Sequence, residues 1–278
     1  MNAVALVVSY DSGFRGRRMG AGPEHLIARG VLDALPHGAV EVRTFVAAED
    51  RMRAEAASAF EIQCWLAAQV REARDAGALP LVFAGNCITS VGTVAGLRAH
   101  ARRSPGVCWF DAHADLNTPE TTRGGFLDGM ALAMLTGRCW TALAAQVPGF
   151  VAVKEHDIVL VGARDLDPAE RDALVASEIV WAERAQDAAS RLNTLARVVS
   201  EVYLHVDLDV LDVSEARANG YASAGGLTRR QLVDLVRDLR ARTRVGAIAF
   251  TAYDPTCDTD ERVPSIVREL ISTIAAPD

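Results

Sequence analysis

The chain alternates short apolar runs with longer amphipathic stretches. Six runs rich in valine, isoleucine and leucine lie at residues 3–9, 78–85, 106–113, 156–164, 202–210 and 246–254. Helical patterns follow them, as in residues 60–77 and in residues 227–243, where Thr228 is a predicted N-cap. This repetition is typical of a largely parallel sheet with helices on both faces. The pattern predicts an α/β fold, and without a linker or repeat we expect a single domain over residues 1–278.

Composition narrows the class of protein. The chain is half hydrophobic, yet no apolar stretch is long enough to span a bilayer and no basic segment precedes the first apolar run, so we expect neither a membrane span nor a signal peptide. The net charge of -7 is spread along the chain, which argues against nucleic acid or membrane partners and favours a small molecule. Five cysteines without a CxxC pair fit a reducing cytoplasm.

Polar residues gather where several of the apolar runs end. They read GNC at 85–87, DAHAD at 111–115, RDLD at 164–167, DLD at 207–209 and YDP at 253–255. Ligands of open parallel sheets bind beyond the carboxyl ends of the strands. We therefore expect these five segments to converge on one site.

Two of these segments carry metal-ligand side chains at every second position. Asp111, His113 and Asp115 form the first set, and Asp207 and Asp209 repeat the spacing. Side chains on a strand alternate between faces, so each set points to one side. Carboxylates with an imidazole suit Mn²⁺ or a comparable divalent ion. Two ions about 3.5 to 4 Å apart would balance the negative charge and activate water at neutral pH, which explains the pattern better than helix caps or solvated charges.

The segments DAHADLN and HVDLDVLD together resemble the paired signatures of the arginase and agmatinase family of ureohydrolases. The resemblance extends through GAGPEHLIARG at 20–30, AGNCITSVG at 84–92, GGLT at 225–228 and DPTCD at 254–258. It implies a three-layer α/β/α domain with a mostly parallel central sheet. It also implies a homo-oligomer, commonly a trimer or a hexamer.

Carried over position by position, the resemblance implies a site for two manganese ions. Asp111 and Asp207 would bridge the two ions. Asp115 would be a further ligand of one ion, and His113 and Asp209 would be ligands of the other. The bridging hydroxide would attack the central carbon of a guanidino group. The carboxylates would accept and orient its proton, and an amine would leave.

Two positions near the metals, Cys87 and Asp128, depart from the family pattern, and a strand histidine lies beside them. Cys87 stands where the family has a metal-binding histidine, and either a thiolate ligand for a weakly held or replaced ion or a buried neutral thiol fits this change. His205 shares a strand face with Asp207, so it could supply an imidazole near the metals or compensate for the histidine missing at position 87, although we favour a hydrogen bond to a neighbouring carboxylate. Asp128 replaces a proton-relaying histidine, and it could relay the proton itself or cap the helix that follows.

The expected substrate site keeps the arginase pattern at the end that binds the amino-acid head group and departs from it at the end that binds the guanidinium. The resemblance assigns Asn117 and neighbouring loop groups such as Thr122 to an α-carboxylate, and Asp167 with Glu170 to an α-ammonium. Helix capping is the alternative role for both acids and is compatible with binding. At the other end, Ala252 replaces a glutamate that pairs with the guanidinium. Since alanine cannot hold a cation, we expect a neutral or weakly basic reacting group.

These features favour a manganese-dependent hydrolase of a C–N bond in a modified arginine-like amino acid. Nω-Hydroxy-L-arginine fits best, because N-hydroxylation lowers the basicity of the guanidine. One alternative is an amidine, formimino or amide hydrolase that uses the same metal site. The other is a catalytically silent relative that binds an amino acid.

Overall fold

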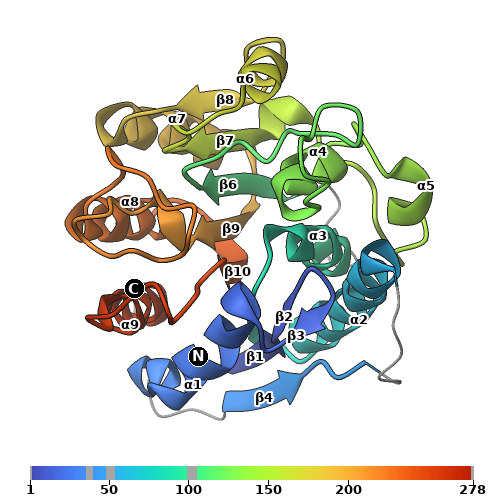
Figure 1. Cartoon of the computed structure of the whole chain (residues 1–278). Coiled ribbons are helices and arrows are strands. Elements are labelled where there is room, and N and C mark those ends of the chain that lie inside the picture. The colour runs from blue at the N-terminus through green and yellow to red at the C-terminus, as the bar shows by residue number, and fades with distance from the viewer. Residues whose placement is uncertain (1, 36–39, 48–53, 99–104, 277–278) are drawn as a thin grey trace.

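The computed structural model describes residues 2–35, 40–47, 54–98 and 105–276 (Figure 1). Within these ranges one sheet has the strand order β4-β1-β5-β10-β9-β6-β7-β8, and every neighbouring pair is parallel. The strands are β1 (Ala3–Val8), β4 (Val40–Thr44), β5 (Leu79–Ala84), β6 (Gly106–Phe110), β7 (Ile158–Val161), β8 (Val180–Ala182), β9 (Glu201–Asp207) and β10 (Arg244–Thr251). The prediction of a mostly parallel sheet is confirmed.

The six predicted strands are the six inner strands of this sheet. The two that the apolar pattern did not predict, β4 and β8, lie at its edges. An inner parallel strand is buried on both faces and therefore reads as a continuous apolar run. β4 has the sequence VEVRT with every residue at least partly exposed, and β8 has only three residues. Edge strands of this kind lack the signal on which the prediction depended.

Helices cover both faces of the sheet and give three layers (Figure 1). One core cluster includes Leu66, Val91 and Leu132, and a second, on the other face, includes Leu192, Leu232 and Val267. On the first side lie α2 (Glu55–Asp75), α3 (Ser90–Arg98), α4 (Ala131–Leu135) and α5 (Thr141–Ala144). On the second lie α1 (Gly22–Ala28), α7 (Ala185–Val198), α8 (Arg229–Arg240) and α9 (Arg262–Ala275), while α6 (Pro168–Val175) lies near the β8 edge.

Local signals account for the ends of two predicted helices. α8 begins at a capping box in which Thr228 and Gln231 bond each other's backbone groups, as the N-cap prediction required. α2 ends at Asp75, before Gly77 with its left-handed φ of 70°. It begins at Glu55, five residues before the predicted start, because the apolar periodicity weakens over the alanine-rich first turns.

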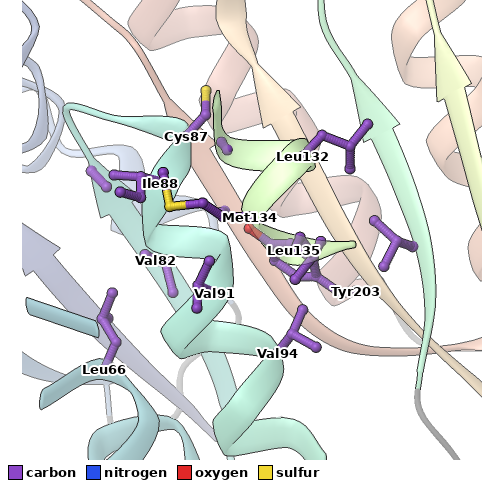
Figure 2. Packing of buried hydrophobic residues seen from close by; sticks show 14 of the residues in the cluster. Leu66, Val82, Cys87, Ile88, Val91, Val94, Leu132, Met134, Leu135 and Tyr203 are labelled. Atoms are coloured by element: carbon purple, nitrogen blue, oxygen red, sulfur yellow. The ribbon is translucent and has the colours of Figure 1, made fainter. Parts of the chain in front are cut away.

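One core cluster reaches the site through Cys87 (Figure 2). Val91, Val94 and Leu135 pack together within the cluster, whereas Cys87 lies at its border with its sulfur pointing away from the other labelled side chains. The side chain thus joins the hydrophobic core to the end of β5. The backbone after β5 passes close to Tyr10 at Gly85. A Cβ at this position would lie 2.2 Å from the Tyr10 carbonyl oxygen, so only glycine fits.

Two further findings concern membrane spans and disulfides. In the described ranges, no helix is both long enough and apolar enough to cross a membrane. All five cysteines, Cys64, Cys87, Cys108, Cys139 and Cys257, carry free thiols.

Candidate active site

A cavity of about 290 Å³ lies at the carboxyl edge of the sheet. It is formed beyond β5, β10, β9 and β6, which are consecutive neighbours in the sheet. All the site residues predicted from the sequence line it except Asp111 and His205, which are buried next to residues that do. Segments far apart in the chain therefore converge on one site, as expected for the carboxyl ends of parallel strands.

The segment YDP does not contribute as expected. Asp254 closes a turn by accepting hydrogen bonds from the Thr256 backbone amide at 2.9 Å and from its hydroxyl at 2.7 Å. The Tyr253 hydroxyl donates to Asp258. Of this region, Ala252 lines the cavity instead. The expectation was wrong because the strand ends at Thr251, and the next residues turn away from the edge.

The first group of potential metal ligands consists of Asp111, His113 and Asp209. Their ligand atoms lie within 4.8 Å of one another, and His113 Nδ1 is 3.3 Å from Asp111 Oδ1 and 3.5 Å from Asp209 Oδ2. Burial opposes protonation of the imidazole, but the carboxylates of Asp209 and Asp111 outweigh it and raise the pKa of His113 to about 10. A proton therefore occupies the place where a divalent cation would balance the same charges.

A second group shares Asp111 and adds Cys87 and His205. Cys87 Sγ donates to Asp207 Oδ2 at 2.9 Å and lies 3.2 Å from Thr251 Oγ1. The pKa of the Cys87 thiol is raised well above its usual value, first by burial and then by the charge of Asp207. This geometry is compatible with both predictions for Cys87. The thiol is neutral in the metal-free protein, and its sulfur lies where it could bind a metal ion after losing its proton.

His205 has different partners from the one favoured by the sequence. Its Nδ1 is 2.9 Å from the Tyr203 hydroxyl and its Nε2 is 3.3 Å from Thr251 Oγ1, so hydroxyls rather than a carboxylate hold the ring. The ring stacks on Trp109 with centroids 3.7 Å apart. Burial lowers the pKa of His205 to about 3, which keeps the imidazole neutral. The expected hydrogen bond to a carboxylate was therefore wrong, because the hydroxyl groups of Tyr203 and Thr251 occupy both ring nitrogens.

Asp128 caps a helix, but not the one that follows it. The N-cap position of α4 is Met130 and makes no side-chain bond. Asp128 instead accepts hydrogen bonds from the backbone amides of Cys87 and Ile88 at the start of the 3-10 helix η3 (Cys87–Thr89), and from Asn86 Nδ2 at 2.9 Å. Burial raises its pKa to about 7, so near neutral pH the carboxyl group can gain or lose a proton. The side chain also faces the cavity.

The residues assigned to an amino-acid head group all line the cavity. Asn117 Oδ1 accepts from Thr121, and Thr122 Oγ1 accepts from the Gly125 amide. Glu170 Oε1 accepts from the Leu116 amide at 3.2 Å, which ties α6 to the loop after β6. The side chain of Asp167 makes no capping hydrogen bond although it occupies the N-cap position of α6. Capping therefore does not account for this carboxylate.

A methyl group and an aromatic wall line another part of the cavity. Ala252 contributes the methyl and has a left-handed φ of 58°, while Met19, Phe126 and Tyr221 contribute larger side chains. The rings of Phe126 and Tyr221 stack with centroids 5.8 Å apart, and Tyr221 also meets the His113 ring edge-on at 6.5 Å. The Arg18 guanidinium lies over the Phe126 ring at 5.9 Å. Position 252, where the family pattern has a glutamate, contributes only a methyl group to the cavity lining.

Sequence reasoning missed several residues that hold the site together. Trp109 Nε1 donates to Asp111 Oδ2 at 2.9 Å, and its position two residues before Asp111 could have revealed it, because both lie on one face of β6. Asn219 Nδ2 donates to Asp209 Oδ2 at 3.1 Å and to the Ala252 carbonyl at 2.8 Å. Asn219 and Tyr221 lie in a loop without periodicity, so no sequence signal identified them.

The site gathers more buried acid than its own cations can balance. Burial raises the pKa values of Asp111, Asp115 and Asp207, and the charges of neighbouring carboxylates raise them further. Asp115 Oδ2 is buried and has no hydrogen-bond partner among the described residues. Buried carboxylates of this kind are stable when protonated or when they bind cations. The donor set therefore fits divalent metal ions.

Replacement of Asn219 by alanine is expected to weaken ion binding about 10- to 100-fold, as loss of an outer hydrogen bond to a metal ligand usually does. The variant loses the bonds that fix Asp209 and the end of β10. Competition with a chelator measures the change. Tyr221→Phe is the control, because it keeps the Tyr221 amide that donates to Asn219 Oδ1. Equal ion affinity in Asn219→Ala and wild type would contradict this role.

The metal-free protein is expected to lose stability as the pH rises from 7 to 9. The pKa of His113 is raised to about 10 in the folded state, so its contribution is complete below the unfolded value of about 6.5 and is lost as the pH rises through 10. Each proton held only by the folded state gives a slope of about 1.4 kcal/mol per pH unit. Urea unfolding in a chelator measures it. An unchanged slope in His113→Asn would refute the assignment.

The fold and the site together indicate the class of this protein. Oxygen and nitrogen donors lie at the carboxyl edge of a parallel sheet, next to a cavity with polar and apolar parts, as in a metal-dependent hydrolase of the α/β/α type. The particular family follows from comparison with known proteins. The model of the arginase family matches residues 7–276, and the chain belongs to this family. Its members are metal-dependent ureohydrolases that act on guanidino or amidino groups, which makes this protein an enzyme of that type.

Individual relatives support this assignment. An arginase of Bacillus caldovelox is 31% identical over 218 residues, which cover 75% of this chain and 72% of the relative. An arginase of Brucella melitensis is 28% identical over 292 residues, which cover 98% of this chain and 94% of the relative. Among solved structures, arginase from Bacillus cereus has a TM-score of 0.89 at 25% identity and covers 100% of this chain and 99% of its own. The three-layer fold is thus confirmed.

Proposed function

We propose that this enzyme hydrolyses a C–N bond in a modified guanidino amino acid, with Nω-hydroxy-L-arginine as its substrate and manganese as its metal. Ala252 carries this proposal. Its methyl group lines the cavity, and Asn219 links its carbonyl to the Asp209 carboxylate, so a cationic guanidinium there would need a carboxylate partner that position 252 does not supply. A hydroxylated guanidine is less basic and needs no such partner. Water would add to the guanidine carbon, and hydroxyurea and L-ornithine would leave.

The chain's own groups would bind and orient the substrate. Asn117 and Thr122 would bind the α-carboxylate, while Asp167 and Glu170 would bind the α-ammonium. The support is that all four line the cavity that His113 and Asp115 also line. The aromatic wall would exclude water from the reacting end, which strengthens electrostatic interactions there.

Proton transfers would fall to two carboxyl groups. When bound, two divalent ions would supply a water activated as a nucleophile near neutral pH. Asp115 would accept and orient the proton of that water. Its buried Oδ2, which finds no hydrogen-bond partner within the described part of the chain, supports this role. Asp128 would then protonate the leaving amine, because a carboxyl group with a pKa of about 7 can give up a proton near neutral pH. His205 would act from outside the cavity, where its ring lies close to Cys87 and Asp111.

Product analysis by mass spectrometry tests the proposal. The manganese-loaded enzyme is incubated separately with L-arginine, Nω-hydroxy-L-arginine and an N-formimino amino acid. Formation of hydroxyurea and ornithine, with little turnover of arginine, is the expected result. Turnover of the formimino compound alone would favour an amidine hydrolase, which Ala252 also permits. Bound metal without any turnover would favour a silent amino-acid-binding relative.

Two further proposals concern the state of the protein in the cell. We propose a homo-oligomer, a trimer or a hexamer, in the cytoplasm. Free thiols on all five cysteines support a reducing compartment. Light scattering after size-exclusion chromatography measures the oligomer, and a monomeric mass would contradict it.

A further inference from the structure

The two groups of ligands that share Asp111 differ in their donor atoms. Asp111, His113 and Asp209 offer oxygen and nitrogen, with two carboxylates among three side chains. The group of Cys87, Asp111 and His205 offers sulfur, nitrogen and oxygen, and Asp207 Oδ2 lies 2.9 Å from the sulfur as a fourth donor. Cys87 and Asp111 follow β5 and β6, while His205 and Asp207 lie in the last three residues of β9.

The imidazole of this second group is held in a fixed orientation. Tyr203 binds Nδ1 at 2.9 Å, and the Trp109 ring stacks on the imidazole at 3.7 Å with an interplanar angle of 15°. Nε2 is the ring nitrogen that Tyr203 leaves for an ion, and Nε2 and the Cys87 sulfur share a neighbour in Thr251 Oγ1, which lies 3.3 Å from Nε2 and 3.2 Å from Sγ. A histidine that binds a metal through one nitrogen is usually oriented in this way through the other.

We infer that Cys87 and His205, together with Asp111 and Asp207, form a position selective for Zn²⁺ or Co²⁺ over Mn²⁺. The inference rests on the proposed binuclear site and specifies the ion at one of its positions. Thiolate and imidazole donors favour zinc-type ions in tetrahedral sites, whereas carboxylates suit manganese. The group of Asp111, His113 and Asp209 keeps its preference for manganese. The enzyme accordingly binds two different ions, and the manganese of the proposed function occupies only the position formed by Asp111, His113 and Asp209.

Cys87 and His205 are 118 residues apart in the sequence, and the fold brings them together. Cys87 follows β5 and His205 lies inside β9, and these strands are separated in the sheet by β10. His205 thus restores an imidazole on the side where position 87 lacks one. The thiol gives up one proton when an ion binds, so binding at this position releases a proton to the solvent.

Cobalt titration of the metal-free enzyme tests the inference without measuring turnover. The expected spectrum has a near-ultraviolet thiolate-to-cobalt charge-transfer band and the intense visible bands of tetrahedral Co²⁺. Cys87→Ser is expected to lose the charge-transfer band. Cys108→Ser is the matched control, because Cys108 is a buried thiol on β6 outside both groups, and it should leave the spectrum unchanged.

A second variant tests the histidine. His205→Gln should keep the charge-transfer band and bind Co²⁺ at least tenfold more weakly at this position, with circular dichroism showing that the variant is folded. Should it misfold, metal analysis of the wild type and of Cys87→Ser after dialysis against equal Zn²⁺ and Mn²⁺ decides. Zinc binds most nitrogen and oxygen sites more tightly than manganese, so the measured quantity is the difference between the two proteins. A higher zinc-to-manganese ratio in the wild type than in Cys87→Ser supports the inference. An equal ratio in both proteins, a spectrum without sulfur ligation, or a folded His205→Gln with unchanged affinity would overturn it, whatever the product analysis gives.

Discussion

Replacing Asp111 by asparagine is expected to abolish binding of both metal ions and to lower kcat/KM at least on the order of a thousandfold, because water is then no longer activated near neutral pH. Asp111 is the one side chain that the two ligand groups of the described residues share. It also accepts hydrogen bonds from Trp109 Nε1 and the His113 amide, so the carboxylate is fixed in position before any ion arrives. An amide cannot supply the negative charge.

Metal content per chain and product formation measure this effect together. Asp165→Asn serves as the control, because Asp165 lines the same cavity but belongs to neither ligand group, and its side chain is exposed. The control should retain both ions. If Asp111→Asn kept two ions and near-normal turnover, the metal site would have to lie elsewhere.

Replacing Ala252 by glutamate is expected to shift the preference of the enzyme toward L-arginine. The ratio of kcat/KM for arginine to that for Nω-hydroxy-L-arginine should rise at least tenfold, since a carboxylate beside the cavity pairs with the fully cationic guanidinium. The left-handed φ of 58° at this position is the same burden for alanine and glutamate, so the backbone does not select between them. The added charge lies close to Asp209 and lowers stability.

The matched control for this experiment is Ala252→Gln. Glutamine has nearly the shape of glutamate without its charge, so it separates the ion pair from the volume of the side chain. It should not raise the ratio for arginine. An equal shift in both variants would show that size rather than charge sets the preference. A folded Ala252→Glu with an unchanged ratio would mean that position 252 does not contact the reacting group.

The sequence identified the inner part of the fold better than its margins. Strands buried on both faces are continuous apolar runs, so β1, β5, β6, β7, β9 and β10 were predicted with their order along the chain. β4 and β8 are partly exposed edge strands and gave no such run. The side-by-side order of the strands was not predicted, because it depends on how the helices pack against both faces.

The residues of the candidate site also fall into two sets, those that the sequence predicted and those that it did not. Asp111 directly follows β6 and Asp207 ends β9, so the direction of parallel strands brought both acids to one edge, and that much follows from local geometry. The expectation that strand alternation aligns the other ligands was wrong, because His113 and Asp115 lie beyond β6 and Asp209 lies in the 3-10 helix Leu208–Val210. The residues around the acids do not follow from local geometry either, because Asn219 comes from an irregular loop and Asp128 caps a helix 40 residues earlier in the chain.

By itself the sequence determined that this protein is a parallel α/β protein with an acidic cluster at its strand ends, since backbone periodicity and strand direction are local properties of the chain. The tertiary structure decided which atoms meet. It pairs His205 with Tyr203 and Thr251 rather than a carboxylate, and it turns Asp254 away from the cavity. Such contacts join segments from different strands and loops, and only the packing of the whole sheet and its helices fixes their distances.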